Sequence, residues 1–168
     1  MASKSSTFDK ATKRLVIQAM NYNVHSIGDF TLPETVLLLR ETIKKQPVFK
    51  KVFGYNRKIT NVPASTDYCK IISNYIKEKT GSLQPDDDYN LWTLMEIPEY
   101  IQRTLEIPDH WWLVYNQTGE IFDVTYDQFP YEFPYQYGQP VMRLKKDEEF
   151  KDILMAHAQI LAKEAGLR

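Results

Sequence analysis

Residues 110–129 have the sequence His110-Trp-Trp-Leu-Val-Tyr-Asn-Gln-Thr-Gly-Glu-Ile-Phe-Asp-Val-Thr-Tyr-Asp-Gln-Phe129. Two runs rich in aromatic and β-branched residues, 110–115 and 120–126, flank a turn-forming Asn-Gln-Thr-Gly segment. This arrangement is typical of an antiparallel hairpin, because such runs favour strands and the segment between them favours a tight turn. We therefore expect an antiparallel sheet to be built on these residues.

The register of this hairpin decides which side chains meet. If Tyr115 pairs with Glu120, His110 lies opposite Thr125, and Asp123 lies one diagonal step away on the same face, within side-chain reach. An imidazole would then lie beside a carboxylate. A slip of one residue would turn Asp123 to the other face, since side chains alternate along a strand.

The chain has one cysteine, Cys69, so it cannot form an internal disulfide. This residue lies in the first turn of a predicted helix that Ser65 or Thr66 can cap and that ends at Gly81. At a helix N-terminus the dipole and the unpaired backbone amides favour a thiolate and can also bind an oxyanion. We expect a reactive, accessible thiol; the alternative is that Cys69 is a small buried hydrophobic residue on the apolar face of the helix.

A histidine that is oriented by a carboxylate and lies beside a thiol forms a nucleophilic site. In this interpretation Cys69 attacks a carbonyl, His110 takes and returns the proton, and Asp123 fixes the tautomer of the imidazole. Asp127 is a second candidate for orienting the imidazole, should the register favour it. The three catalytic candidates are therefore Cys69, His110 and Asp123.

The order of these residues resembles that of the papain-like/NlpC-like cysteine hydrolases: a Cys at a helix start, a His on a strand and an Asp on the next strand. More narrowly, residues 110–129 are similar to the pattern His-Trp-x-x-(turn)-Gly-x-Ile-x-Asp-x-Thr-x-Asp-Gln-Phe of small, mostly phage-encoded proteins of uncharacterised activity. Residues 69–81 match loosely and 130–138 match in kind, so the resemblance covers about 65–145. It implies a papain-like fold and a cysteine hydrolase or acyl-transferase that acts on a peptide, isopeptide or side-chain amide bond.

Two features favour a different function on the same fold. The bulky pair Asp67-Tyr68 precedes Cys69, and no glutamine lies shortly upstream of the cysteine as an oxyanion donor; Asn61 is the nearest amide. These features fit a catalytically inert papain-like module that binds a host or partner protein, for instance as a phage counter-defence factor. The sequence leaves both alternatives open.

The 168-residue chain has the composition of an ordinary globular protein, with 43% hydrophobic residues and a formal net charge of −1. Its length suits a single domain, 1–168. We expect an α+β fold in which the Cys-bearing helix packs on the antiparallel sheet, with N-terminal and C-terminal helices. Within the domain we expect a helical, basic N-terminal part at 1–60, a papain-like core at 61–145 and a C-terminal helix at 146–168.

Hydrophobic periodicity and capping residues predict the remaining elements. Amphipathic helices are expected at 7–20 and 31–46, a short strand and a short helix within 91–104, and a last helix at 145–168. Residues 129–137 place aromatic residues among prolines, which is unfavourable for a central strand. This aromatic segment could line a cleft.

Charge is distributed unevenly along the chain. Residues 1–80 contain 14 Lys and Arg against 6 Asp and Glu, whereas 81–168 contain 7 against 16. Between 44 and 58, basic residues alternate with aromatic ones, a mixture that can bind phosphates by charge and bases by stacking. Nucleic-acid binding through 44–58 is a further alternative, although a solvated helix and loop face explains the same charges more simply.

No apolar run approaches the roughly 20 residues that span a bilayer, and the N-terminus lacks the hydrophobic core of a signal peptide. We therefore expect a cytoplasmic protein, in the host cytoplasm if the chain is phage-encoded, whose partner is a protein or peptide and not a membrane. No second cysteine or tight histidine cluster suits a metal, so no metal or cofactor is expected. His25 is more simply a loop histidine and His157 a core histidine. The sequence does not decide the oligomeric state.

Overall fold

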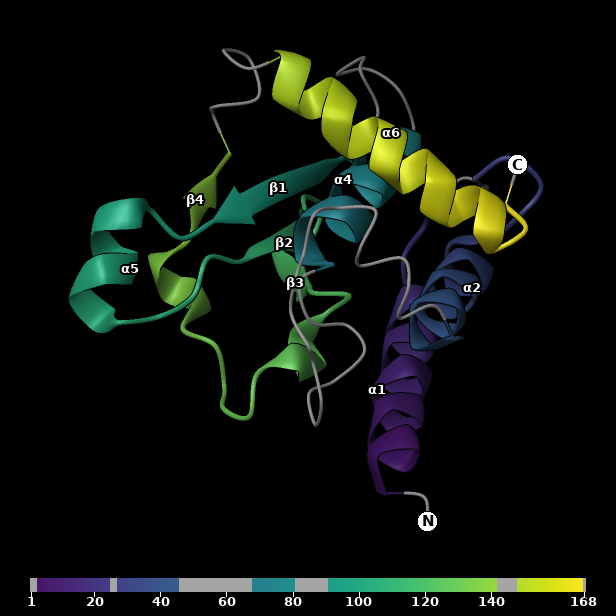
Figure 1. The fold of residues 1–168 in the computed structure, drawn as a ribbon, viewed down its shortest axis with the longest axis horizontal. Helices are drawn as coiled ribbons and strands as arrows, with labels where there is room; N and C mark the ends of the chain where they lie inside the picture. Colours follow the sequence, from purple (N-terminus) through teal and green to yellow (C-terminus); the bar gives the residue numbers. More distant parts are fainter. Residues whose placement is uncertain (1–2, 25–26, 46–67, 81–90, 142–147, 168) are drawn as a thin grey trace.

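A computed structural model describes residues 3–24, 27–45, 68–80, 91–141 and 148–167 (Figure 1). Among these residues the protein has the expected α+β architecture, with five α-helices and one four-stranded antiparallel sheet. The helices are α1 (Ser3–Ala19), α2 (Leu32–Lys45), α4 (Cys69–Thr80), α5 (Glu99–Leu105) and α6 (Glu148–Glu164). The strands are β1 (Trp92–Glu96), β2 (Trp111–Tyr115), β3 (Glu120–Phe122) and β4 (Gln139–Pro140).

The helices begin and end near the predicted positions, and local capping explains one start. At α2 the Glu34 amide donates to Thr31 Oγ1 (3.2 Å), and the Thr31 amide donates to the Glu34 carboxylate (3.3 Å). This reciprocal pair is a capping box, which satisfies backbone amides that the first turn leaves without a helical partner. The helix that carries the cysteine is shorter than predicted, and Cys69 is its first residue.

The sheet confirms the predicted hairpin register. Its strand order is β3-β2-β1-β4, with all neighbours antiparallel, and Tyr115 pairs with Glu120. The reversal between β2 and β3 includes Gly119, whose φ of 73° lies in the left-handed region that glycine adopts without steric cost. If this register is extended past the paired residues, His110 lies opposite Thr125, and Asp123 lies diagonally from His110.

The prediction of a strand over 120–126 was wrong in its length, because β3 ends at Phe122. Beyond Phe122, two other hydrogen bonds replace those between the strands. The Thr125 amide donates to Asp123 Oδ1 (3.1 Å), and the Val124 carbonyl accepts from Arg40 (2.6 Å). An aspartate side chain that binds a backbone amide two residues later competes with strand pairing, so the chain turns here into a short 3₁₀ helix.

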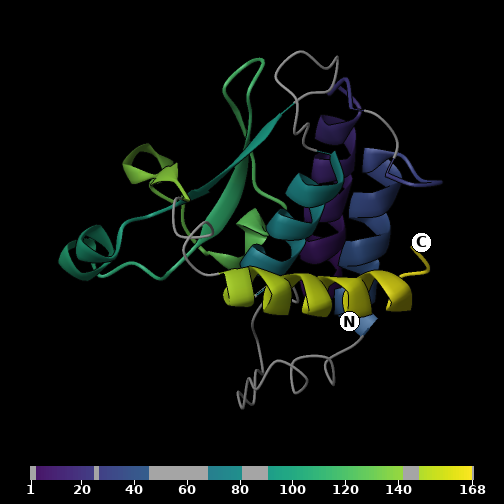
Figure 2. The same cartoon turned by 90° about the horizontal axis from the view of Figure 1, so that it is seen from above.

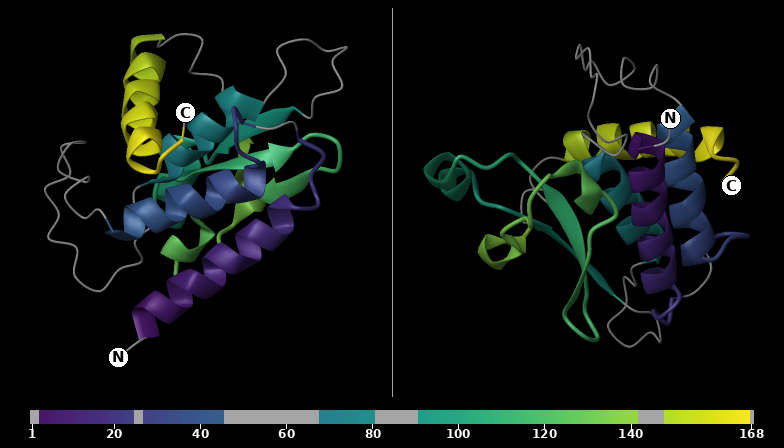
Figure 3. Two further views of the ribbon diagram at one scale, coloured as in Figure 1. Left: turned by 90° about the vertical axis from the view of Figure 1, so that its right-hand side faces the viewer. Right: turned by 90° about the horizontal axis from the view of Figure 1, so that it is seen from below.

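The helices α1, α2, α4 and α6 all lie on one side of the sheet (Figure 2). α4 packs on β1 and β2, and its other side contacts α6, while α1 and α2 pack against each other. Figure 2 shows α5 at the far end of the sheet from α1 and α2. Figures 2 and 3 show α6 running crosswise to α1 and α2. The main core joins these layers through fully buried side chains that include Leu15, Val36, Leu39, Ile72, Ile76, Leu113 and Phe122.

A second, smaller core lies under the aromatic segment 129–137, which forms no strand, as predicted. It contains Ile97, Trp112 and Phe133. Gly138 packs against this core, and a Cβ at that position would overlap the Trp112 ring. A residue with a side chain would therefore displace either the indole or the backbone.

Some sequence predictions fall outside the described residues and stay predictions. They concern the caps at Ser65 and Thr66, the amide Asn61, the loop histidine His25 and most of the basic stretch 44–58. In the part of the chain that the structure describes, no helix is long and apolar enough to cross a membrane.

Candidate functional site

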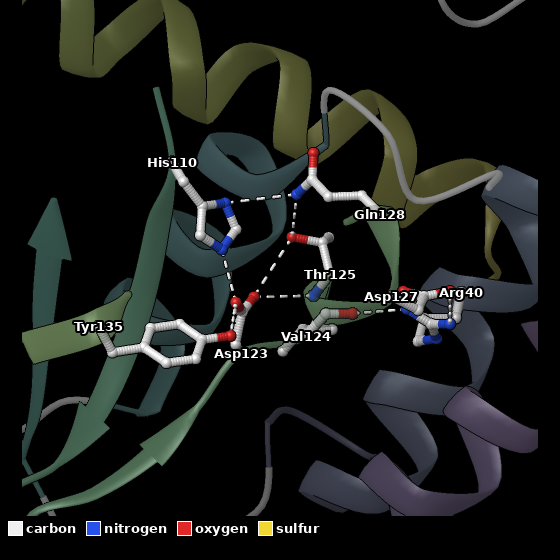
Figure 4. A network of polar contacts seen from close by, with 8 residues as sticks. All are labelled: Arg40, His110, Asp123, Val124, Thr125, Asp127, Gln128 and Tyr135. Atoms are coloured by element: carbon white, nitrogen blue, oxygen red, sulfur yellow. Dashed lines mark hydrogen bonds and ion pairs between the residues drawn. The ribbon is translucent and has the colours of Figure 1, made fainter. Parts of the chain in front are cut away.

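The hairpin brings His110 and Asp123 together. His110 directly precedes β2 and Asp123 directly follows β3, and the imidazole Nε2 lies 2.5 Å from Asp123 Oδ2 (Figure 4). Both side chains are buried, with 0% and 3% of their surface exposed. A contact this short between buried polar groups is a charge-assisted hydrogen bond when the imidazole is protonated.

Both carboxylate oxygens of Asp123 accept hydrogen bonds. Oδ1 accepts from the Thr125 amide (3.1 Å) and from the Thr125 hydroxyl (3.4 Å). Oδ2 accepts from the Tyr135 hydroxyl (2.6 Å) in addition to His110. Burial first, and then the charge of Asp123, raise the pKa of Tyr135, so the phenol keeps its proton and remains a donor.

The surroundings of His110 favour its protonated form. Burial lowers the pKa of His110, but the charge of Asp123 and its hydrogen bond, together with a hydrogen bond to Cys69 and the Cys69 charge, more than compensate and raise the pKa to about 10. At neutral pH both ring nitrogens therefore carry a proton. Trp112, Phe129 and Phe133 surround the ring, with centroid separations of 5.7, 4.7 and 4.8 Å, and separate it from solvent.

The second imidazole nitrogen, Nδ1, faces the remaining site residues. Gln128 Nε2 lies 3.3 Å from Nδ1 and donates to Thr125 Oγ1 (2.9 Å). Asp123 occupies Nε2, and the Cys69 thiol is among the groups that raise the pKa of the imidazole. The imidazole thus has the Asp123 carboxylate at Nε2 and the Gln128 amide at Nδ1.

Cys69 is part of the main core, and the expectation of an accessible thiol was wrong. The residue is 6% exposed and the preceding Tyr68 is 1% exposed. The physical reason is the placement of α4, which packs on the sheet with one side and on α6 with the other. A reagent reaches this thiol only through a local opening of the surrounding residues.

A salt bridge on the surface joins the residues next to Cys69 and His110. Lys70, next to Cys69, lies 2.5 Å from the carboxylate of Asp109, next to His110. The Lys70 ammonium also lies 5.3 Å from the centre of the Trp111 ring. These contacts connect the start of α4 to the start of β2.

Asp127 does not orient His110. Its carboxylate forms a bidentate pair with Arg40 of α2, with distances of 3.0 and 2.9 Å. Arg40 is fully buried, and it also donates to Thr12 Oγ1 of α1 (2.8 Å) and to the Val124 carbonyl. Arg40 therefore fixes the loop that carries Asp123 to the two N-terminal helices.

The aromatic segment lines a cleft, as the sequence suggested. The cleft has a volume of about 910 Å³ and lies between α1 and residues 120–135. Asp123 and Tyr135 contribute to its wall, but Cys69 and His110 do not. The cleft therefore reaches the carboxylate but neither the imidazole nor the thiol.

Four further residues of this network were not identified as site residues from the sequence. Thr125 and Gln128 lie within the hairpin motif, and their contacts depend on the turn that ends β3. Tyr135 was one of several aromatic residues in its segment, with nothing to distinguish it. Arg40 lies in a leucine-rich helix, and no local signal connects it to the hairpin.

Within the described residues, no group of three or more His, Cys, Asp and Glu side chains could hold a metal ion. Comparisons of the chain with protein-family models, with curated proteins and with solved structures find no match. An assignment of function therefore depends on the geometry of the site.

Proposed function

We propose that this protein is a papain-like cysteine hydrolase or acyl-transferase that acts on a peptide, isopeptide or side-chain amide bond. The supporting observation is the buried pair of His110 and Asp123, with the Cys69 thiol among the groups that raise the pKa of the imidazole. This arrangement is the one that activates a sulfur nucleophile.

In the proposed reaction the Cys69 thiolate attacks the carbonyl carbon, and the electron pair of the C=O bond moves to oxygen. His110, protonated at Nδ1, gives that proton to the leaving amine as the tetrahedral intermediate collapses to a thioester. Water or an acceptor amine then attacks the thioester, and His110 takes up its proton. Asp123 remains ionised throughout and keeps the imidazole oriented through Nε2.

A catalytically inert, papain-like protein-binding module is the second candidate. The burial of Cys69 and of Tyr68 before it favours this alternative, since a nucleophile must touch its substrate. In this alternative the His110 and Asp123 pair serves to stabilise the loop after β3. The two candidates differ in whether His110 changes the chemistry of the thiol.

The experiment is acylation of Cys69 by 4-nitrophenyl acetate, followed by intact-mass spectrometry and by release of nitrophenolate. We expect the wild type to form a Cys69 thioester at least tenfold faster than His110→Ala at pH 7, and Cys69→Ser to form none. His157→Ala is the matched control, because this partly buried histidine belongs to α6, and its rate should equal that of the wild type. Equal rates in the wild type and His110→Ala would support the inert module.

A further inference from the structure

We propose that the cleft between α1 and residues 120–135 binds a basic peptide segment of a partner protein. Its volume of about 910 Å³ lies in the range of ligand-binding pockets, roughly 300–1,000 Å³. Neither Cys69 nor His110 lines this cleft, so its ligand is independent of the proposed reaction.

Four carboxylates line the cleft, and two of them are already paired inside the protein. Asp123 is paired with His110, and Asp127 is paired with Arg40 (Figure 4). The cationic side chains of both pairs are 0% exposed and do not line the cleft. These two carboxylates are therefore not available to a charged ligand.

The other two carboxylates, those of Glu120 and Glu132, are exposed, and neither forms an ion pair with a cation of the described residues. Glu120 accepts a hydrogen bond from the Gln18 amide (3.0 Å). Among the described residues that line the cleft, Arg14 is the only cation, and it lies over the ring of Tyr126. The exposed charges of the cleft are thus two carboxylates and one guanidinium, which favours a cationic ligand.

Arg14 shows how a ring of this cleft holds a cation. Its guanidinium carbon lies 4.6 Å from the centre of the Tyr126 ring, a cation–π contact. Phe129 and Tyr131 form a second aromatic surface in the same cleft, with ring centroids 5.7 Å apart, and Tyr131 is 47% exposed. Glu132 follows Tyr131 in the sequence and also lines the cleft. A ligand cation in this part of the cleft can therefore contact both an aromatic face and a carboxylate.

The rim of the cleft favours a peptide over a lone cation. Ile17 of α1 and Ile121 of β3 line the cleft with 51% and 37% of their surface exposed. Apolar side chains of this kind suit the aliphatic stems of lysine and arginine. The exposed carboxylates come from two segments, Glu120 from the hairpin and Glu132 from the aromatic segment, which suits a ligand with more than one cation. The phosphates of a nucleic acid would be repelled by these carboxylates.

Fluorescence polarisation of a short labelled peptide of alternating arginine and alanine residues, at low ionic strength, tests the proposal. We expect the full chain to bind this peptide saturably and the double variant Glu120→Gln/Glu132→Gln to bind it about tenfold more weakly, because two ion pairs are lost. Glu106→Gln/Glu164→Gln is the matched control. It removes the same charge from exposed positions outside the cleft and should change the affinity less than about twofold.

Two further variants test the aromatic surface and the cation of the cleft itself. Tyr131→Ala should weaken peptide binding about threefold, whereas Tyr131→Phe, which keeps the ring, should bind like the wild type. Arg14→Gln should strengthen binding about twofold, because it removes a cation that repels the peptide.

Equal losses in the two double variants would overturn the proposal, because the peptide would then respond to the net charge of the chain and not to the cleft. Absence of peptide binding to the wild type would overturn it as well. So would tighter binding of a single-stranded oligothymidylate of similar length, which would indicate a nucleic-acid ligand. Failure of the proposed function gives a different result: Cys69→Ser and His110→Ala would lack any effect on acylation while peptide binding stays as expected.

Discussion

The loop after β3 carries two aspartates, and each is paired with a buried cation from another part of the chain. Asp123 pairs with His110, and Asp127 pairs with Arg40; the cationic side chain is 0% exposed in both pairs. The cations differ in chemistry. A guanidinium stays charged at any pH at which the protein is folded, whereas an imidazole gains and loses protons.

The groups around the two pairs also differ in their chemistry. Arg40 donates to the Val124 carbonyl and to the hydroxyl of Thr12, and neither group has a role in the proposed reaction. His110 instead has the Gln128 amide at Nδ1 and the Cys69 thiol among the groups that raise its pKa. We infer that the Arg40 pair holds the loop in place and that the His110 pair uses this fixed loop for chemistry. The predictions below test this division, from the largest expected effect to the smallest.

Arg40→Met should give the largest loss of stability. The substitution leaves Asp127 buried without its cation and removes the donors to Thr12 Oγ1 and the Val124 carbonyl. Removing one partner of a buried ion pair costs about 3–5 kcal/mol of unfolding free energy. Urea titration followed by circular dichroism measures this loss.

Arg103→Ala is the control for that loss, since Arg103 forms an exposed helical pair with Glu99 in α5. Exposed pairs contribute about 0.5 kcal/mol or less. A loss below about 1 kcal/mol in Arg40→Met would contradict the structural role of Arg40.

The sequence predicted the part of the site that depends on local pairing. A turn between two strand-like runs fixed Tyr115 opposite Glu120, and this register alone brought His110 and Asp123 to one face. The end of β3 could not be predicted in the same way. The end of β3 depends on Arg40, which lies in a helix more than 80 residues earlier and donates a hydrogen bond to the Val124 carbonyl.

The pH dependence of stability should differ between the wild type and Asp123→Asn. The pKa of His110 is raised in the folded protein to about 10. The stabilisation that protonated His110 adds to the free energy of unfolding is therefore fully present below about pH 6.5 and is lost as the pH rises through 10. In Asp123→Asn burial dominates and disfavours the charged imidazole, so this decline should disappear or reverse. Free energies of unfolding of both proteins, measured from pH 6.5 to 9, test this difference. Parallel curves for the wild type and Asp123→Asn would contradict a protonated His110 paired with Asp123.

Tyr135→Phe should have the smallest effect of the three. It removes one hydrogen bond to Asp123 Oδ2 and keeps the ring that packs on Trp112. We expect a loss of about 1 kcal/mol in thermal unfolding experiments, with little change in thiol reactivity, because Thr125 and His110 still hold the carboxylate.

Tyr137→Phe, at an exposed position two residues later, should change stability by less than about 0.5 kcal/mol. A loss of thiol reactivity in Tyr135→Phe as large as that in Asp123→Asn would contradict the assignment of the orienting role to the carboxylate.

The burial of Cys69 shows a second limit of the sequence. Position at a helix N-terminus predicts a reactive thiol, but exposure depends on how α4 packs between the sheet and α6. Helical periodicity does show that Cys69 shares a face with apolar residues. It does not show which neighbours cover that face, since these come from distant parts of the chain.

The alkylation rate of Cys69 by iodoacetamide tests the division between the two aspartates most directly. It is measured at pH 7 and 15 °C on Asp123→Asn, Asp127→Asn and the wild type, with the folded fraction of each determined by circular dichroism. The account predicts that Asp123→Asn reacts at least tenfold more slowly than the wild type, whereas Asp127→Asn is less stable but reacts at the wild-type rate per folded molecule. Unchanged reactivity in Asp123→Asn would contradict it.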